Sequence, residues 1–193
     1  MSSFKKILTT PFFDLEATEE TDSRVEPYYR MRSANSVIIC VLDHSDRFLL
    51  VRQYRPNIEY QTLEFPAGAI EPNETQADAA HREFEEETGH LSSLLKIGSA
   101  RLMMNRSTNK EFLFFGVGAT LSKSPCVDSS ISLEKIQRHD FIEMVKEDKF
   151  EQLAALGLLA QASLRLGLDL FASSFEEIQT AFSKQLGTEE ANY

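Results

Sequence analysis

The order of apolar runs along the chain predicts an α/β fold built on a mixed β-sheet. Short β-branched or aromatic runs come first, at 36–42 and 47–54, and another follows at 111–117. A helical pattern at 75–88 lies between them, and helical patterns continue from Phe141 onward. Strands followed by a central helix, a strand and further helices favour one α/β domain.

The first half of the chain is expected to supply most of the strands. Residues 14–26 are polar and acidic, so we expect them to connect N-terminal strands. The turn signal at 43–46 (DHSD) separates the first two apolar runs and predicts a β-hairpin. Residues 60–65 predict a further short strand, which ends at Pro66-Ala67-Gly68.

The second half is expected to be mainly helical. The helix predicted over 75–88 should end at Gly89, because glycine readily adopts the left-handed conformation that ends many helices. A polar loop is expected at 122–130 and a strand at 131–137. The later apolar patterns are typical of helices packed on a core.

Composition and charge narrow the classes of function. The 193 residues carry a net charge of −10, which disfavours binding to nucleic-acid phosphates. No apolar run is long enough to span a bilayer, so no membrane role is expected. The segment from Met1 to Lys6 does not resemble a signal peptide, and two cysteines, Cys40 and Cys126, are poor material for a disulfide framework. We therefore expect a cytoplasmic protein.

Three carboxylates share one side of the predicted helix. At about 100° per residue, Glu83, Glu86 and Glu87 fall within an arc of about 100°. The stripe expected to pack on the sheet lies beside that arc and consists of Ala77, Ala80, Phe84 and Thr88.

Carboxylates so close together repel one another unless a cation lies between them. Carboxylate, carbonyl and phosphate oxygens are the ligands that Mg²⁺ accepts. The turn at 66–72 precedes the helix and is expected to bring backbone carbonyls toward the same ions. The alternative is an acidic helix face in solvent, but only one basic residue, Arg82, is present to pair with it.

Residues 68–90, GAIEPNETQADAAHREFEEETGH, resemble the Nudix box. Eight fixed positions match at the family's spacing: Gly68, Glu74, Arg82, Glu83, Phe84, Glu86, Glu87 and Gly89. His90 departs from the pattern, because an aliphatic residue is usual at that position. The departure concerns the packing of the chain just after the helix, not metal binding.

The resemblance implies the Nudix fold, a mixed sheet sandwiched between helices, and a divalent metal, Mg²⁺ with Mn²⁺ as a possible substitute. It implies that Glu83, Glu87 and Glu86 bind the metal, together with the carbonyl of Ala67. Gly68, Glu74, Arg82 and Gly89 are implied to have structural roles in the motif. Glu74 is expected to brace Arg82, although the Arg82 guanidinium also suits a phosphate.

The general base has two candidates. In the most similar branch of the family the base often lies in a loop well past the box, and Glu134, in the segment 132–136, aligns loosely with it. Glu134 is otherwise a surface carboxylate. Glu86 is the alternative base within the box.

Residues 49–56 and 63–68 resemble the ADP-ribose and nucleotide-sugar pyrophosphatase branch, as does the helical tail from Phe141 to Leu166. This implies that Arg55 and Glu111 contact the substrate; their alternative roles are a salt bridge and a strand-edge carboxylate. Residues 103–110 lack the proline of the segment common in ADP-ribose enzymes. ADP-ribose therefore leads other nucleoside diphosphate sugars only narrowly.

The same resemblance divides the chain into an N-terminal strand region, 1–34, and a Nudix domain with its C-terminal helices, 35–193. The first region is similar to the small sheet that this branch uses to form homodimers. Four aromatic residues are candidates for that interface or for the monomer core: Phe12, Phe13, Tyr28 and Tyr29.

Two other functions remain open. One is hydrolysis of another nucleotide, a nucleoside triphosphate or a dinucleoside polyphosphate. The other is a regulator that binds nucleotide without catalysis, although such domains usually lose a box carboxylate and none is lost here.

Overall fold

The computed structural model describes residues 3–19, 22, 24–123 and 130–190. Three strands form a separate N-terminal sheet in the order β1-β2-β3, all antiparallel: β1 (Phe4–Thr9), β2 (Phe13–Thr18) and β3 (Tyr29–Ser33). Residues 14–18 were expected in a connection, and this prediction was wrong. Asp14 pairs with Thr9 and with Arg32 across the sheet, so the segment is held as the central strand despite its acidic side chains.

The main sheet of the described chain has eight strands. Its central order is β11-β5-β4-β10-β8, with β6 on β5, β7 on β4 and β9 on β10. The strands are β4 (Ser36–Asp43), β5 (Arg47–Arg55), β6 (Tyr60–Glu64), β7 (Ala67–Ala69), β8 (His90–Leu91), β9 (Leu94–Ala100), β10 (Glu111–Leu121) and β11 (Ser132–Gln137).

The sheet is mixed, as predicted, because β10 and β4 pair in parallel whereas the other recorded pairs are antiparallel. The hairpin at 43–46 is also confirmed. Strands β7, β8 and β9 were not predicted as separate strands.

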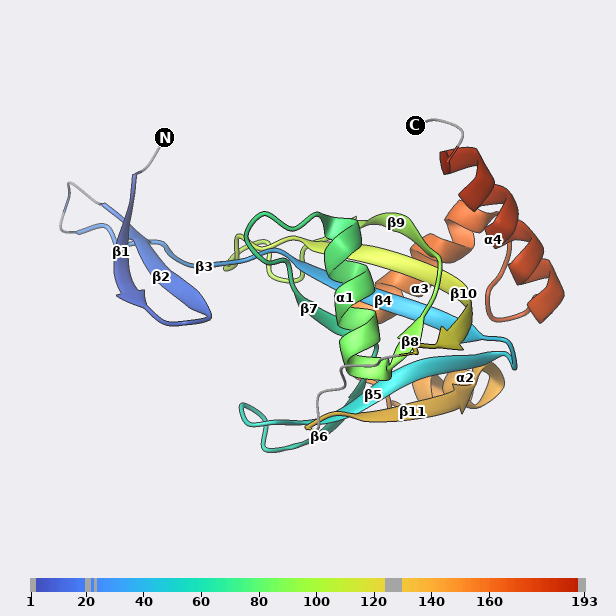
Figure 1. The fold of residues 1–193 in the computed structure, drawn as a ribbon. Helices are drawn as coiled ribbons and strands as arrows, with labels where there is room; N and C mark the ends of the chain where they lie inside the picture. The colour runs from blue at the N-terminus through green and yellow to red at the C-terminus, as the bar shows by residue number, and fades with distance from the viewer. Residues whose placement is uncertain (1–2, 20–21, 23, 124–129, 191–193) are drawn as a thin grey trace.

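Four helices cover the two faces of this sheet: α1 (Gln76–Thr88), α2 (Arg138–Lys146), α3 (Leu153–Leu166) and α4 (Phe175–Glu190). Figure 1 shows α1 in front of the sheet and α3 behind it. The layered α/β arrangement with a mixed sheet between helices is therefore confirmed. No helix among the described residues is long and apolar enough to cross a membrane.

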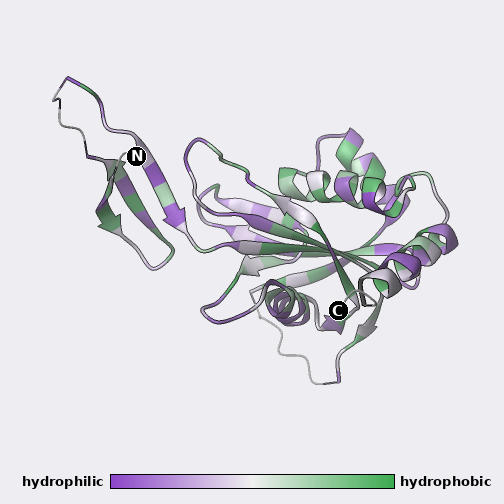
Figure 2. Ribbon diagram, turned by 90° about the horizontal axis from the view of Figure 1, so that it is seen from above, coloured by the Kyte–Doolittle hydropathy of each residue, from purple (hydrophilic) through white to green (hydrophobic). Residues whose placement is uncertain are grey.

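Strand β4 explains why the core has two halves. The cluster on the α1 side contains the odd-numbered residues of β4 from Val37 to Val41. The cluster packed by α2, α3 and α4 contains its even-numbered residues from Ile38 to Leu42. Successive side chains of a strand point to opposite faces, so a strand buried on both faces is apolar throughout. In Figure 2 the hydrophobic colouring runs along these central strands between the helices.

The N-terminal sheet lies apart from the main sheet in both views (Figures 1 and 2). Its attachment is through β3, where Met31 pairs with the loop before β10. The Met31 N–H donates to the Arg106 carbonyl at 2.7 Å, and the Met31 carbonyl accepts from the Thr108 N–H at 3.0 Å. The first sheet ends at Ser33, and β4 begins at Ser36.

Candidate active site

Helix α1 begins and ends where its sequence predicts. The Thr75 hydroxyl accepts a hydrogen bond from the Asp78 N–H at 3.1 Å and caps the N-terminus. Gly89 adopts φ 69°, and its N–H donates to the Glu85 carbonyl at 2.8 Å. The helix starts directly after the loop that follows β7, so these caps fix the carboxylates relative to that loop.

The buried stripe of α1 differs from the expected one. Ala77 is exposed, and the buried residues are Ala79, Ala80, Phe84, Glu87 and Thr88. With Glu83 at 0°, this arc runs from about 320° to about 140°, and Glu87 lies near its middle at about 40°. Glu87 is therefore part of the buried face of the helix rather than beside it.

Glu87 is buried, with only 7% of its surface exposed, and this burial governs its chemistry. One carboxylate oxygen, Oε2, accepts a hydrogen bond from the Ala67 N–H at 3.0 Å. Burial, reinforced by the negative charges of Glu83 and Glu64, raises the pKa of Glu87 to about 8, although the Ala67 N–H and Arg55 act in the other direction. The site thus holds a carboxyl group that costs free energy to ionise unless a cation is added.

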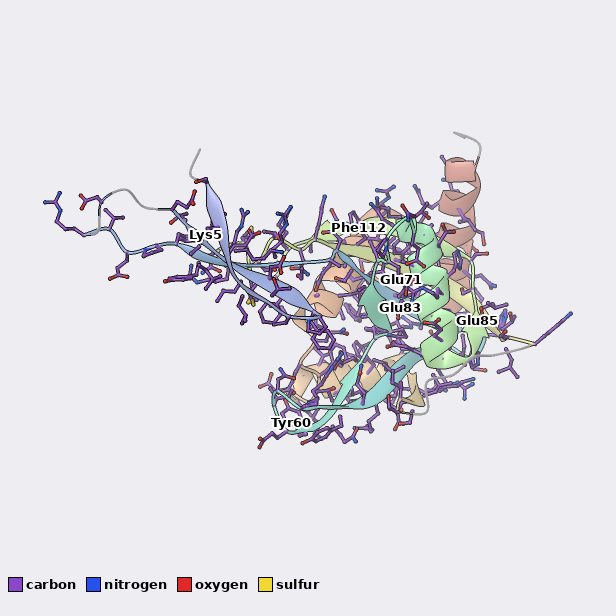
Figure 3. All side chains as sticks on the ribbon, turned by 60° about the vertical axis from the view of Figure 1, so that its left-hand side comes forward. Lys5, Tyr60, Glu71, Glu83, Glu85 and Phe112 are labelled. Atoms are coloured by element: carbon purple, nitrogen blue, oxygen red, sulfur yellow. The ribbon has the colours of Figure 1, made fainter. Side chains whose placement is uncertain are left out.

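Glu83 lies on the side of α1 that faces β7, whereas Glu85 points from the opposite side (Figure 3). An ideal Cβ placed on Gly68 would lie 2.0 Å from the Glu83 Cδ, so only a glycine leaves room for this carboxylate beside the loop. Burial raises the pKa of Glu83, and Arg82 offsets part of that effect. Glu83 and Glu87 therefore meet the same short segment, Ala67-Gly68.

Arg82 braces the loop against the helix. Its Nε and Nη2 donate to the two oxygens of Glu74 at 2.8 and 2.9 Å, and Nη2 also donates to the Ala69 carbonyl at 3.1 Å. Its Nη1 donates to Glu83 at 2.7 Å and to Glu86 at 3.1 Å. Arg82 holds the pKa of Glu74 at about 2, so that carboxylate stays ionised.

The three expected metal-binding carboxylates do not converge on one point. Within the described parts of the chain, no three His, Cys, Asp or Glu side chains are grouped closely enough to hold a metal ion. Glu83 and Glu86 contact Arg82, whereas Glu87 contacts Ala67. The donor set still fits a hard divalent cation, since it offers carboxylate and carbonyl oxygens, and the buried Glu87 and Glu83 charges repel each other without one.

A cleft of about 710 Å³ opens beside this site, between the β5–β6 hairpin and the segment that joins α2 to α3. Arg55 lies in it and donates through Nε and Nη2 to the Glu64 carboxylate at 2.7 and 2.6 Å. Burial opposes ionisation of Glu64, but hydrogen bonds from Arg55 and Thr62 outweigh it and lower its pKa. The Glu64 contact and, more weakly, the charge of Glu87 raise the pKa of Arg55. The cleft and the carboxylate cluster are thus electrostatically linked.

The cleft lining combines basic, aromatic and apolar side chains. It includes Arg52, Arg55, Tyr60, Leu102, Met144 and Lys149. A phosphate suits the basic groups, and a base or sugar face suits the flat and apolar ones.

Glu111 lies at the start of β10, level with Ser36 on β4. Its side chain is half-buried, and burial raises its pKa. Its Oε2 is buried and has no hydrogen-bond partner among the described residues.

Glu134 lies on strand β11, not in a loop. It pairs with Leu50, which belongs to the α2–α4 side of the core, whereas its neighbour Leu133 packs against the α1 side. The pleat therefore directs Glu134 to the face opposite α1, where it accepts a hydrogen bond from Arg52 at 3.1 Å. Much of the preceding loop, residues 124–129 with Cys126, lies outside the described residues.

His90, the departure from the box pattern, is buried after the helix. Its Nδ1 lies 2.7 Å from the Thr88 carbonyl and its Nε2 lies 3.0 Å from the Lys135 Nζ. A carbonyl can only accept, so Nδ1 carries the proton and Nε2 accepts from the lysine. The polar ring is satisfied at both ends, which explains how it replaces an aliphatic side chain.

Two residues of the site were not assigned from sequence. Glu64 precedes Phe65-Pro66-Ala67 and links Arg55 to the region of Glu87, and an acidic residue in this position beside the loop was a usable signal. Gln152 contacts the Phe65 backbone from 87 positions away, and nothing in the local sequence indicates it.

Comparison with known proteins gives one matching family and several relatives. The NUDIX domain family matches residues 32–152. ADP-sugar pyrophosphatase of Mus musculus is 42% identical over 76 residues, which cover 37% of this chain and 35% of that protein. ADP-ribose pyrophosphatase of Saccharomyces cerevisiae is 42% identical over 50 residues, 26% of this chain and 22% of that protein. These alignments therefore span only about a third or less of each relative.

A solved structure shares the fold over most of the chain. A crystal structure of an ADP compounds hydrolase superposes with a TM-score of 0.70 at 19% identity, covering 86% of this chain and 92% of the other. The family match extends over more than half of the 193 residues and includes the loop, the helix and the carboxylates described above. The chain belongs to the Nudix domain family.

Proposed function

We propose that this protein is a divalent-metal-dependent hydrolase that splits the diphosphate linkage of a nucleoside diphosphate sugar, with ADP-ribose favoured. The products would be a nucleoside monophosphate and a sugar phosphate. The observation that carries this proposal is the meeting of Glu83 and Glu87 at Ala67-Gly68, next to a cleft that contains Arg55. The names of the mouse and yeast relatives support an ADP-linked sugar.

Glu83, Glu87 and the Ala67 carbonyl are the groups that would hold Mg²⁺ or Mn²⁺, with Glu86 beside them. When bound, such an ion neutralises charge on the diphosphate and lowers the pKa of a coordinated water. Arg82 holds Glu83 and Glu86 on the loop side of α1, and Glu74 in turn fixes Arg82. Gly68 and Gly89 keep the loop and the helix end in the conformation this arrangement needs.

The proton of the attacking water requires a carboxylate within reach. Glu86 is on the same helix as the proposed ligands and its side chain is 43% exposed, so it is accessible from solvent. Glu134 is paired with Arg52 and directed to the other face of the sheet. Geometry favours Glu86 as the general base over Glu134.

Arg55 and Glu111 are proposed to contact the substrate. Arg55 supplies positive charge inside the cleft, where a diphosphate or a base would lie. Glu111 offers a buried carboxylate oxygen that lacks a partner among the described residues, so a substrate hydroxyl can satisfy it.

A substrate panel tests the proposal. The purified protein is incubated with Mg²⁺ and, separately, with ADP-ribose, other nucleoside diphosphate sugars, nucleoside triphosphates and dinucleoside polyphosphates. We expect AMP and ribose 5-phosphate from ADP-ribose, and ¹⁸O-labelled water identifies the phosphorus that is attacked. Faster turnover of a nucleoside triphosphate would show that triphosphates, and not nucleoside diphosphate sugars, are the preferred substrates. Tight nucleotide binding without turnover in Mg²⁺ or Mn²⁺ would instead identify a regulator.

We also propose that the protein forms a homodimer through its N-terminal sheet. Apolar side chains on this sheet and beside it are unusually exposed: Ile7 54%, Leu8 53%, Phe12 84%, Tyr28 45% and Tyr29 46%. A cluster of this kind is typical of a protein interface. Of the four aromatic residues left open between interface and monomer core, Phe12, Tyr28 and Tyr29 are exposed and Phe13 is partly buried.

A further inference from the structure

Phe65 connects two short strands of the main sheet, the second of which begins with the proposed metal ligand Ala67. It is fully buried, and it lies between the end of β6 at Glu64 and the start of β7 at Ala67. Its ring packs against three other aromatic rings at centroid distances of 5.4 to 5.8 Å: those of Phe48, Phe141 and Phe150. Its backbone N–H and carbonyl lie outside both strands, so a buried partner is required.

Gln152 supplies that partner. The Phe65 N–H donates to the Gln152 Oε1 at 2.8 Å, and the Gln152 Nε2 faces the Phe65 carbonyl at 3.5 Å. A backbone N–H can only donate, which fixes the orientation of the side-chain amide. One amide side chain thus reproduces, on a single residue, the pair of bonds that a neighbouring strand would make.

The position of Gln152 indicates that this contact is not incidental. Gln152 is the N-cap residue of α3, yet its side chain makes no capping hydrogen bond to its own helix. Its backbone carbonyl serves the helix, accepting from the Ala155 and Leu156 N–H groups at 3.1 and 3.4 Å. The side chain extends instead to a segment 87 positions earlier in the chain.

The next two peptides are also held. The Pro66 carbonyl accepts from the Ile39 N–H of β4 at 2.9 Å, and the Ala67 N–H donates to Glu87 of α1 at 3.0 Å. The segment 65–67 is therefore fixed by three separate elements: α3, β4 and α1. Gln152, the N-cap residue of α3, provides the contact at the N-terminal end of this segment, at Phe65.

We infer that Gln152 is a positioning residue that sets the Ala67 carbonyl for divalent metal binding. This inference rests on the proposed function, because Ala67 is a metal ligand only in that proposal. Without Gln152, the Phe65 peptide loses both of its side-chain partners, and the segment that carries the Ala67 carbonyl is held only by its contacts with β4 and α1. Partners that orient metal ligands in this way are known to affect metal affinity strongly.

The test compares Gln152→Met with Gln179→Met. The first variant keeps side-chain length but removes both hydrogen bonds, and the second makes the same chemical change at an exposed position on α4. Mn²⁺ binding is measured by electron paramagnetic resonance well below the melting temperature, and exchange of the Phe65 amide hydrogen is followed by NMR. We expect Gln152→Met to weaken Mn²⁺ binding about tenfold and to accelerate Phe65 exchange, with Gln179→Met unchanged.

A third variant guards against a general folding defect. Gln152→Glu keeps an acceptor for the Phe65 N–H, so we expect it to retain Phe65 protection and Mn²⁺ binding. Unchanged Mn²⁺ affinity in Gln152→Met, with faster Phe65 exchange, would show a purely structural role and overturn the inference. So would an equal loss of affinity in Gln152→Glu and Gln152→Met. Failure of the wild type to hydrolyse any nucleotide while binding Mn²⁺ would overturn the proposed function alone.

Discussion

At the scale of single residues, Glu87 lies where burial makes its ionised form unfavourable. It occupies the middle of the buried face of α1, and both Glu83 and Glu64 add negative charge nearby. Only the Ala67 N–H and the more distant Arg55 favour its ionised form. A divalent cation would convert this unfavourable arrangement into a binding site, because it reverses the sign of the interaction with each carboxylate.

Replacing Glu87 by glutamine tests that interpretation. Glutamine has nearly the same size as glutamate but carries no charge. The substitution therefore removes the free-energy cost of burying that charge. We therefore expect Glu87→Gln to be at least as heat-stable as the wild type in the absence of metal, while turnover falls by several orders of magnitude. Calorimetric melting and steady-state kinetics measure the two effects. Glu85→Gln removes a charge from the same helix, where Glu85 contacts Ser122, and should retain activity. Equal activity of Glu87→Gln and the wild type would remove Glu87 from the mechanism.

At the scale of elements, strand β7 and helix α1 lie so close at residue 68 that the Glu83 carboxylate occupies the space a side chain would take there. A Cβ on Gly68 would meet the Glu83 carboxylate at 2.0–2.3 Å, which is far closer than atoms can approach. That carboxylate is the end of a flexible side chain, so it can rotate away.

Gly68→Ala should therefore fold with little loss of stability but displace Glu83 and weaken metal binding and turnover. Thermal melting and Mg²⁺-dependent kinetics check both parts. The matched control is Gly157→Ala in α3, where a Cβ meets nothing within 4 Å. A Gly68→Ala enzyme with wild-type dependence on Mg²⁺ concentration would contradict the assigned role of Glu83.

The β4–β5 hairpin depends on one buried carboxylate. Asp43 accepts hydrogen bonds from the Ser45 and Arg47 N–H groups at 2.8 and 3.1 Å, and from the Arg47 guanidinium at 2.9 and 2.7 Å. Burial opposes its ionisation, but these bonds outweigh burial and lower its pKa below 3.8. A lowered folded-state pKa contributes stability that is present above the unfolded value and is lost as the pH falls through the folded value.

We expect Asp43→Asn to reduce the free energy of unfolding by about 1–3 kcal/mol at pH 7. The difference from the wild type should stay constant down to about pH 5 and shrink below about pH 4, as wild-type Asp43 becomes protonated. Urea unfolding at pH 7, 5 and 3 measures it, with the exposed Asp148→Asn as control. A difference that is the same at pH 3 and pH 7 would exclude the ionised Asp43 as its source.

The sequence predicts those parts of the fold that depend on local signals. Thr75 and Gly89 mark the ends of α1, and the turn at 43–46 marks the hairpin, because caps and turns are set by neighbouring residues. The Phe65 contact with Gln152 depends on how α3 docks, and no local pattern encodes it. The buried stripe of α1 was misassigned at Ala77 for the same reason, since the sheet and not the helix decides which arc is covered.

The periodicity of α1 predicts which carboxylates share a side of the helix, but not the conformations that their side chains adopt. The spacing of Glu83, Glu86 and Glu87 places them on one side of α1, yet Arg82 draws Glu83 and Glu86 to itself while Glu87 turns to Ala67. Rotamers respond to tertiary partners, which the periodicity of a helix does not specify.

At the scale of the whole molecule, the N-terminal sheet has little to bury against within one chain. It stands apart from the main sheet in Figure 1, and β1 exposes Ile7 and Leu8. A three-stranded sheet needs a covered hydrophobic face for stability. A second copy of the chain would provide that cover.

We expect the wild type to be a dimer by light scattering and Phe12→Glu to shift it toward the monomer, because the substitution adds a charge to an exposed apolar surface. Leu164→Glu is the control, since Leu164 is equally exposed but lies on α3, outside the N-terminal sheet. A monomeric wild type, or an equal effect of both substitutions, would exclude the N-terminal sheet as the interface.

The candidate carboxylates and the cleft lie close together in the molecule. Helix α1 carries the carboxylates, the β5–β6 hairpin and the segment that joins α2 to α3 line the cleft, and Arg55 and Glu64 of the cleft act electrostatically on Glu87. This arrangement suits a substrate that has its diphosphate at the loop and its larger groups in the cleft.

Uptake of a divalent cation in the presence of a bound diphosphate tests the central claim most directly. Mn²⁺ is titrated calorimetrically into the wild type and into Glu87→Gln, each with a methylene-bridged, non-hydrolysable analogue of ADP-ribose present. We predict that the wild type takes up Mn²⁺ and that the variant binds it far more weakly. No uptake by the wild type, or equal affinity in the two proteins, would contradict a metal site built on Glu87.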